Sequence, residues 1–266
     1  MGRHKDGTAV YSAFAENEIL KLKNIEHMKI ALIGYGAMGK LIRRLADEKG
    51  HEVVAVIDDG DAGLSATELA GKLDGADAAI DFTTAAAVRR NVDACLKAGV
   101  PLVEGATGWN AQRDDIENAV RNGDGSFVFG ANFSIGVNLF YRIVDRAAEL
   151  VARFPEYEVF IEEQHHSRKK DAPSGTALKL KDVVAKHVSD DFSVSATRAG
   201  NIPGTHRVGF DGSADQILLE HTARSREGFA AGAILAAEWI VGKKGFYEFT
   251  EVMDEICQKG MSEAPA

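Results

Sequence analysis

The glycine-spaced segment ALIGYGAMGKLI, residues 31–42, constrains the fold of this chain more than any other stretch. It places Gly34, Gly36 and Gly39 after a short apolar run and before an amphipathic segment. In a strand–turn–helix unit, the first glycine permits a tight turn, the second lets the backbone approach a pyrophosphate, and the third allows close helix–strand packing. Free amides and the helix dipole then favour an anion. The segment predicts dinucleotide binding, and a glycine turn that serves packing alone is the alternative.

The rest of the first half repeats this alternation of strand and helix. Apolar strands are expected at 29–34, 52–58, 78–82, 100–105 and 126–130, with helices at 37–50, 85–99 and 111–123. Such alternation is typical of a parallel sheet whose right-handed crossovers place helices on both faces. Asp58 ends the second strand, 19 residues after Gly39, near the usual distance for a ribose-binding carboxylate. Asp58 and Asp59 would repel a ribose phosphate, which favours NAD over NADP, while Lys40 partly offsets that repulsion, so both cofactors stay open.

The pattern changes after residue 132. A long helix is expected at 136–154, strands at 156–166, 192–200, 205–212 and 215–225, and helices at 229–242 and 247–260. Strands in succession indicate an antiparallel or mixed sheet. We therefore expect an α/β fold, with a Rossmann-type doubly wound parallel sheet and a second, smaller α+β domain. The expected parts are an appendage at 1–27, a dinucleotide-binding domain at 28–132, a second domain at 133–226, and C-terminal helices at 227–262 that return to the first domain.

Charge and cysteine usage exclude several classes of protein. The chain has 266 residues and a net charge of −9, and an acidic protein repels phosphate backbones, so nucleic acid is not an expected partner. Its two cysteines, Cys95 and Cys257, lack CxxC spacing, which argues against a disulfide scaffold or a zinc site and indicates a reducing cytoplasm. No apolar run reaches the roughly 18 residues that a membrane span needs, so no membrane partner is expected.

Proton carriers and anion binders gather in the segment EEQHHSRKKDAPSGTALKL, residues 162–180. His165 and His166 come at the end of an expected strand, and a histidine can deliver a proton near neutral pH. Lys169 adds a positive charge, and the turn Ser174–Thr176 opens an expected helix whose free amides favour a carboxylate. A proton donor, a carboxylate site and a nicotinamide cofactor together indicate hydride transfer to an unsaturated, carboxylated substrate.

Other interpretations of this segment remain open at the level of sequence. It could be a solvated basic loop in which Asp171 or Ser174 caps the following helix. A metal site is not expected, because adjacent histidines on extended chain point in different directions and no third ligand has a matching spacing. A nucleophilic serine is not expected either, because Ser174 follows a proline and lacks a nucleophile-elbow motif.

The stretch EQHHSRKKDAPSGTA, Glu163 to Ala177, also resembles a family signature. It meets the pattern E-x-H-H-x-x-K-x-D-A-P-S-G-T-A of the bacterial 4-hydroxy-tetrahydrodipicolinate reductases, also called dihydrodipicolinate reductases, without a mismatch. Further similar segments follow in the family's order: GYGAMG at 34–39, AIDFT at 79–83, GATGW at 105–109, ANFSIGVN at 131–138 and RAGNIPGTH at 198–206. The likeness covers residues 28 to about 257.

The resemblance implies roles for individual residues. His165 would be the general acid, Lys169 would assist and bind substrate, His166 would contact a substrate carboxylate, and Ser174, Gly175 and Thr176 would hold one carboxylate. NADH or NADPH, or both, would be bound by Gly34, Gly36, Ala37, Met38, Gly39, Asp58, Phe82, Thr83, Gly105, Ala106, Thr107, Ala131, Asn132 and Phe133. The substrate would be the cyclic dicarboxylate of the diaminopimelate branch of lysine biosynthesis, and the enzyme a homotetramer joined through its substrate-domain sheets.

Three positions depart from the family pattern. Ala37 stands where many members carry an arginine, Ala106 where threonine is more frequent, and Ala131 where some have proline. These changes imply one phosphate contact fewer, one hydroxyl fewer near the nicotinamide and a looser hinge. Two other functions are also compatible with the fold: a different two-domain NAD-dependent amino-acid dehydrogenase, and a cofactor sensor without turnover. The complete segment from His165 to Thr176 argues against both.

Overall fold

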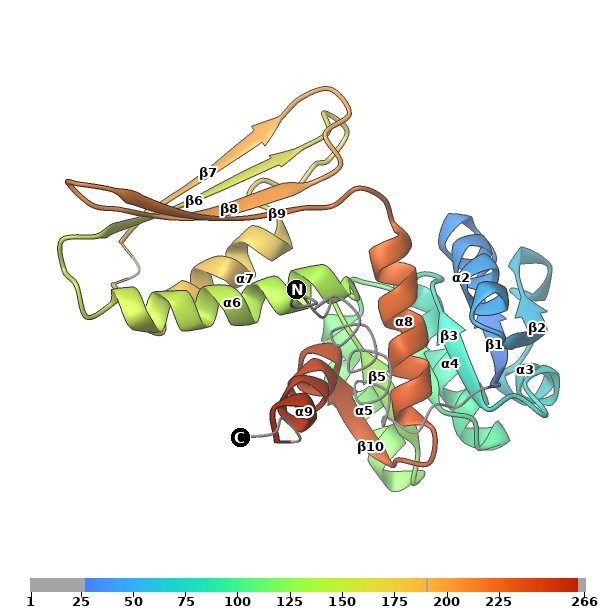
Figure 1. Ribbon diagram of the computed structural model, residues 1–266. Helices are drawn as coiled ribbons and strands as arrows, with labels where there is room; N and C mark the ends of the chain where they lie inside the picture. Colours follow the sequence, from blue (N-terminus) through green and yellow to red (C-terminus); the bar gives the residue numbers. More distant parts are fainter. Residues whose placement is uncertain (1–26, 190, 263–266) are drawn as a thin grey trace, which may run out of the picture.

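The computed structural model describes residues 27–189 and 191–262, so the expected appendage lies outside the described residues except for its last residue. Two sheets, each with its own helices, make up this part of the chain (Figure 1). The larger sheet has six strands in the order β10-β5-β4-β3-β1-β2, and all its pairings are parallel. The predicted doubly wound parallel sheet is therefore confirmed.

The elements of the first half are β1 (Lys29–Ile33), α2 (Ala37–Glu48), β2 (Glu52–Ile57), η1 (Asp59–Asp61), α3 (Ala66–Lys72), β3 (Ala78–Asp81), α4 (Ala85–Ala98), β4 (Leu102–Glu104), η2 (Asn110–Gln112), α5 (Arg113–Asn122) and β5 (Ser126–Phe129). The later elements are α6 (Ile135–Val151), β6 (Glu158–His165), α7 (Gly175–Val184), β7 (Ser193–Arg198), β8 (Thr205–Asp211), β9 (Gln216–Thr222), α8 (Glu227–Ile240), β10 (Gly245–Glu248) and α9 (Phe249–Ser262).

Helices cover both faces of the larger sheet. One buried cluster joins the strands to α2, α8 and α9, and a second joins them to α3, α4 and α5. All four residues of β3 are buried, as expected for a strand shielded on both faces. In Figure 1 α8 lies along the sheet beside α2, so a segment from the end of the chain completes the first domain's helix layer.

Two elements differ from the sequence expectation. Residues 247–248 were expected to be helical, but they belong to β10, which pairs with β5 at the edge of the sheet. The reason is tertiary, because the Phe246 ring stacks on its strand partner Phe127 with centroids 5.1 Å apart, and helical periodicity cannot reveal such a contact. Helix α3 was not expected. Its N-terminus is a capping box between Ser65 and Glu68, which is a recognisable sequence signal for a helix start.

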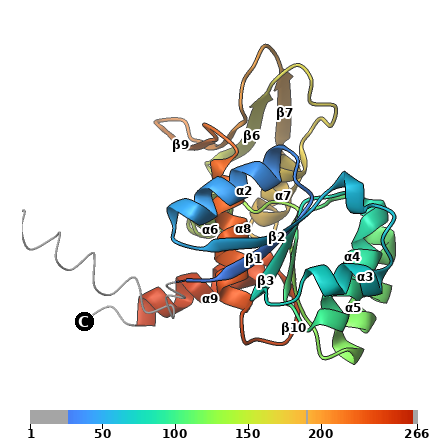
Figure 2. The ribbon, with the colours of Figure 1, turned by 90° about the vertical axis from the view of Figure 1, so that its right-hand side faces the viewer.

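The smaller sheet is mixed, as the succession of strands predicted. Its order is β7-β6-β8-β9, with β6 and β7 parallel and the other two pairs antiparallel. Helices α6 and α7 cover one face and close a separate apolar core (Figure 1). Figure 2, a view from the side, shows this sheet standing above the carboxyl edge of the larger one. No helix in the described ranges has the length and apolar character needed to cross a bilayer.

Candidate active site

The glycine loop lies between β1 and α2, where the sequence places it. An added Cβ on Gly39 would lie 2.2 Å from the carbonyl oxygen of Gly34, so glycine is required there for the helix to pack against the turn. A Cβ on Gly36 would meet nothing within 4 Å, which leaves the backbone open in front of the helix. Gly36 caps α2, whose first turn has no acidic residue. Free amides at an uncompensated helix N-terminus fit a pyrophosphate.

The loops after β3 and β4 pack tightly against the glycine loop. A Cβ on Gly34, where φ is +89°, would be 3.0 Å from the carbonyl oxygen of Phe82, and one on Gly105 would be 2.4 Å from the Phe82 ring. Asp58, at the end of β2, accepts a hydrogen bond from the Tyr35 amide at 3.3 Å. These ends of parallel strands form the edge where doubly wound sheets bind nucleotides. The residues present therefore fit a dinucleotide.

Residues 131–134, called the hinge below, lie between β5 and α6 and connect this edge to the second domain. The Phe82 and Phe133 rings meet edge to face with centroids 6.2 Å apart. Next to Phe133, the Asn132 side chain donates a hydrogen bond to the Thr176 hydroxyl at 3.2 Å. The Ser134 amide in turn donates to the Asn132 side chain at 2.8 Å. The expected cofactor loops, the hinge and the turn before α7 are thus in continuous contact.

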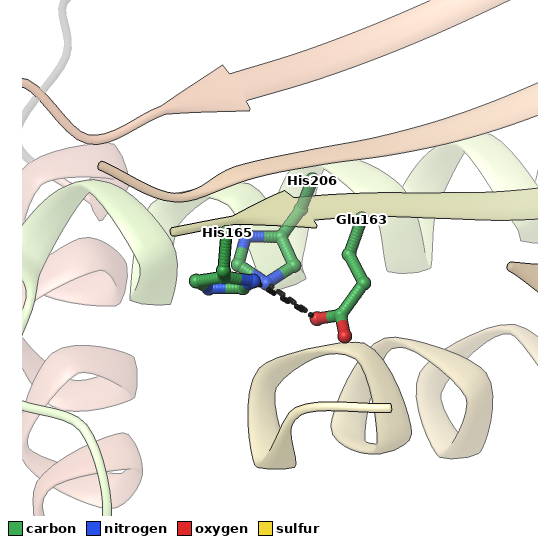
Figure 3. Close-up of side chains that lie close together, drawn as sticks. All are labelled: Glu163, His165 and His206. Atoms are coloured by element: carbon green, nitrogen blue, oxygen red, sulfur yellow. Dashed lines mark ion pairs between the residues drawn. The ribbon is translucent and has the colours of Figure 1, made fainter. Parts of the chain in front are cut away.

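A buried polar cluster around Glu163 lies at the end of β6. Its carboxylate accepts hydrogen bonds from the Ser174 amide at 2.8 Å, from the Ser174 hydroxyl, and from Arg198 Nη2 at 2.6 Å. Nδ1 of His165 and Nε2 of His206 are each 3.5 Å from Glu163 Oε2. Figure 3 shows both imidazoles beside the carboxylate of Glu163, above the start of α7. The cluster thus places a buried carboxylate beside the His165 ring.

Burial and neighbouring groups shift the pKa values of Glu163, His165 and His206. Burial alone would raise the pKa of Glu163, but the hydrogen bonds from Ser174 and Arg198 outweigh it, and the pKa is lowered. Burial, together with the charges of Lys169 and Arg198, lowers the pKa of His165 against the attraction of Glu163. Burial and the neighbouring His165 lower the pKa of His206 to about 4. At neutral pH Glu163 is therefore an anion and His206 is neutral.

Residues 174–176, called the turn before α7, are the N-cap and the first two residues of that helix, and they have the geometry of an anion site. Ser174 is the N-cap, and its side chain accepts a hydrogen bond from the Ala177 amide at 3.2 Å, so the alternative of an N-cap serine is correct for this residue. The Ser174 hydroxyl points into the Glu163 cluster and is buried. Gly175 and Thr176, by contrast, stand in the first helical turn, whose amides have no intrahelical acceptor. Pro173 precedes the N-cap and so lies outside the helix.

Basic and aromatic groups surround the turn. Lys169 Nζ forms an ion pair with Asp171 at 2.9 Å, while a quarter of its side chain remains exposed. Nδ1 of the half-buried His166 has no hydrogen-bond partner among the described residues. Tyr141 hydrogen-bonds to Thr176, and burial raises the pKa of Tyr141 to about 12. The turn thus combines free amides, a cation and an unpaired imidazole nitrogen.

Glu163, His165 and His206 also satisfy the distance test for three metal ligands, because one ligand atom from each lies within 4.8 Å of the others. The donor set does not fit a metal, however. Ser174 and Arg198 already occupy the Glu163 oxygens, and the positive charges of Arg198 and Lys169 would repel a cation. The cluster is better explained as a buried carboxylate that Ser174 and Arg198 hold beside His165.

The structure brings most of the expected site residues to one place. The expected cofactor residues lie in the glycine loop, the loops after β2, β3 and β4, and the hinge, while Thr107 and Ala131 are exposed at that edge. Three members of the Glu163 cluster were not among the expected site residues: Glu163, Arg198 and His206. The sequence held a signal for all three, because Glu163 is the first residue of the segment EQHHSRKKDAPSGTA, and Arg198 and His206 are the first and last residues of RAGNIPGTH.

Comparison with known proteins gives a consistent result. The family model described as "Dihydrodipicolinate reductase, N-terminus" matches residues 28–133, and "Dihydrodipicolinate reductase, C-terminus" matches residues 136–253. A protein of Christiangramia forsetii named 4-hydroxy-tetrahydrodipicolinate reductase is 35% identical over 86% of this chain and 99% of its own length. A Methanosarcina barkeri protein of the same name is 36% identical over 85% of this chain and 99% of its length.

A solved structure supports the fold. The dipicolinate-bound dihydrodipicolinate reductase of Paenisporosarcina sp. TG-14 superposes with a TM-score of 0.72 at 23% identity, covering 85% of this chain and 99% of that one. A probable dehydrogenase from Thermotoga maritima has a TM-score of 0.53 at 10% identity, with 89% of this chain and 97% of that one covered. Both likenesses concern the fold alone.

Proposed function

Since this chain belongs to the dihydrodipicolinate reductase family, we propose that its two domains form one active site in which His165 is the general acid. The chain is an NAD(P)H-dependent oxidoreductase that reduces 4-hydroxy-tetrahydrodipicolinate to tetrahydrodipicolinate in the diaminopimelate and lysine pathway. One observation carries the assignment of the site: the hinge contacts Phe82 on the cofactor side and Thr176 on the substrate side.

Within this site, the bound nicotinamide supplies the hydride. The glycine loop and the amides of α2 would hold its pyrophosphate, and the loops at 82–83 and 105–107 would hold its nicotinamide end. The substrate lies between those loops and the turn before α7, where the amides of Gly175 and Thr176 hold one of its carboxylates. Lys169 and His166 neutralise and orient the substrate's negative charge.

His165 delivers the proton. Its Nδ1 faces the Glu163 carboxylate, and its Nε2 lies 3.3 Å from the Cβ position of Gly204, so the absence of a side chain at Gly204 keeps that edge of the ring accessible. Burial lowers the pKa of His165 in the free protein. A bound dicarboxylate brings two negative charges close to the ring and raises that pKa, because a nearby opposite charge favours the charged imidazolium. Substrate binding thus favours the protonated form of His165.

The direct test is an assay with freshly generated substrate. The purified chain is mixed with the synthase that makes 4-hydroxy-tetrahydrodipicolinate and with NADH or NADPH, and nicotinamide absorbance is followed. We expect substrate-dependent loss of absorbance. Binding of the cofactor without any loss would favour the sensor alternative, and turnover only with an amino acid and oxidised cofactor would favour a different dehydrogenase.

Cofactor preference follows from the acidic pair after β2. Asp58 and Asp59 would repel a 2′-phosphate, which favours NADH, and Lys40, with Nζ 5.9 Å from the Tyr35 ring centroid, would partly offset that repulsion. Side-by-side titration with NADH and NADPH measures the preference. Tighter binding of NADPH would contradict this assignment.

The chain is further proposed to be a cytoplasmic homotetramer. Phe160, Gly209 and Leu218 are register partners across β6, β8 and β9, and Leu218 is 47% exposed. This row lies on the face of the small sheet that α6 and α7 leave uncovered, so a second sheet can pack on it. Light scattering should give about four times the chain mass of 28.6 kDa, and a monomer would refute the assembly.

A further inference from the structure

Two acidic side chains outside the Glu163 cluster are completely buried. Asp81 ends β3, Glu104 ends β4, and both are 0% exposed. They are register partners on adjacent parallel strands, so their side chains extend from the same face of the sheet and lie side by side. Burial and a neighbouring like charge both disfavour the ionised form of a carboxyl group, so the pair carries one proton and one negative charge.

The other oxygens of the pair anchor two loops. Asp81 Oδ1 accepts a hydrogen bond from the Thr83 amide at 2.7 Å, and Glu104 Oε1 accepts one from the Ala106 amide at 2.7 Å. Asn91 Nδ2 donates to Asp81 Oδ2 at 2.6 Å. Oε2 of Glu104 receives no hydrogen bond from a donor in the described part of the chain. It is therefore the oxygen that is free to carry the shared proton.

The charged groups around the pair do not neutralise it in place of that proton. Cys95 on α4 faces both groups, and burial, followed by their charges, raises the pKa of its thiol well above the usual range. Arg90 contacts the pair through Asn91, whose Oδ1 accepts from its Nη2 at 3.1 Å. Arg113 on α5 lies over an aromatic ring of β5, the next strand. Burial raises the pKa of Asp81, and burial with the charge of Asp81 raises that of Glu104 well above the usual range.

We propose that Asp81 and Glu104 are positioning residues for the nicotinamide cofactor, and that their shared proton keeps the loops at 82–83 and 105–107 in the conformation that binds NAD(P)H. This inference rests on the proposed function, because both loops belong to the expected cofactor site. The loops touch each other so closely that a Cβ on Gly105 would lie 2.4 Å from the Phe82 ring. A second negative charge would push the carboxyl groups apart and shift one loop against the other.

Two substitutions of Glu104 separate the effect of its hydrogen bonds from the effect of its side-chain volume. Glu104→Gln keeps an acceptor for the Ala106 amide and places an N–H opposite Asp81, as the protonated carboxyl does. Glu104→Leu fills similar space without either hydrogen bond. Glu117→Gln and Glu117→Leu on α5 are the matched controls, because this carboxylate forms a surface ion pair with Arg121. Circular dichroism confirms that each variant is folded.

Dissociation constants for NADH are measured by nicotinamide fluorescence without substrate. We expect Glu104→Leu to raise the dissociation constant about 10-fold, or about 1.4 kcal/mol, and Glu104→Gln to restore tight binding. The Glu117 variants should bind as the wild type does. In turnover, Glu104→Leu should raise KM for NADH more than it lowers kcat, because His165 and Lys169 remain in place. Wild-type affinity in Glu104→Leu, or equal weakening in both Glu104 variants, would overturn the proposal.

An infrared spectrum tests the proton itself. The wild-type protein at pH 7 should show the C=O stretch of a protonated carboxyl group, and Glu104→Gln should lack it. The absence of this band from the wild type would also overturn the proposal. Failure of the wild type to bind NADH would instead contradict the proposed function, and the infrared result would still report on the pair.

Discussion

Glu163 and Glu104 are almost equally shielded from solvent, with 1% and 0% of each residue exposed, but their pKa values are shifted in opposite directions. Glu163 accepts hydrogen bonds from Ser174 and from the Arg198 guanidinium, and its pKa is lowered. Glu104 has one backbone donor and a second carboxyl group beside it, and its pKa is raised. Burial disfavours charge at both positions. The number and charge of the donors decide whether the carboxyl group ionises.

This difference separates two tasks in the site. The Glu163 cluster holds a fixed anion beside an imidazole, which suits a place where a proton moves during each turnover. The Asp81–Glu104 pair holds a fixed proton under two loops, which suits a place where geometry is maintained. Variants of the first group should therefore change turnover, and variants of the second should change cofactor binding.

The largest effect is expected at His165. His165→Gln removes the proton donor and keeps a similar volume, so kcat should fall by about 10²–10⁴-fold, the usual contribution of a general acid. The dissociation constant for NADH should stay close to that of the wild type, because the imidazole lies in the second domain. Steady-state kinetics and fluorescence titration measure the two quantities. An unchanged kcat would remove His165 from the role of acid and would break the division between the two groups.

Glu163→Gln is expected to have the next largest effect. It leaves the Arg198 guanidinium buried without its anion, and breaking a buried ion pair costs about 3–5 kcal/mol. Because the pKa of Glu163 is lowered on folding, its contribution to stability is complete above about pH 4.5 and is lost as pH falls through the lowered pKa. Urea unfolding at pH 7 and at pH 4 should thus show a variant effect that shrinks in acid. An equal effect at both pH values would mean that charge is not what Glu163 contributes.

Much of this organisation can be predicted from the sequence, because it depends on residues that are close together in the chain. The glycine spacing and the strand–helix alternation require only neighbouring residues, and they locate the dinucleotide-type domain. His165, Lys169 and the turn before α7 stand within twelve residues of one another, so a sequence motif finds them together. The Ser174 cap follows from ordinary helix chemistry.

The remaining features depend on contacts between distant segments. Arg198 reaches Glu163 from 35 positions away, and β10 forms because Phe246 finds Phe127. The Asp81–Glu104 pair requires the register of two parallel strands, which no local pattern encodes. In the sequence, each of the two acids ends an apolar strand. Asp81 is followed by Phe82 and Thr83, and Glu104 by Gly105. Only the fold shows that both point into the same apolar layer.

The smallest effect, and the sharpest test of the contrast, is the pH dependence of stability in Glu104→Gln. A carboxyl group whose pKa is raised on folding holds its proton in the folded state while the unfolded chain releases it above about pH 4.5. Stability is therefore lost as pH rises from that value to the folded pKa, by up to about 1.4 kcal/mol per pH unit for one proton. Glu104→Gln removes this loss, so its stability relative to the wild type should increase with pH, whereas that of Glu163→Gln should stay level over this range, because the contribution of Glu163 is already complete above about pH 4.5. Urea unfolding between pH 5 and 8 measures both slopes, and Glu117→Gln controls for the change in net charge. Equal slopes of stability against pH for Glu104→Gln and Glu163→Gln would show that Glu104 and Glu163 have the same charge state, and the contrast between them would be lost.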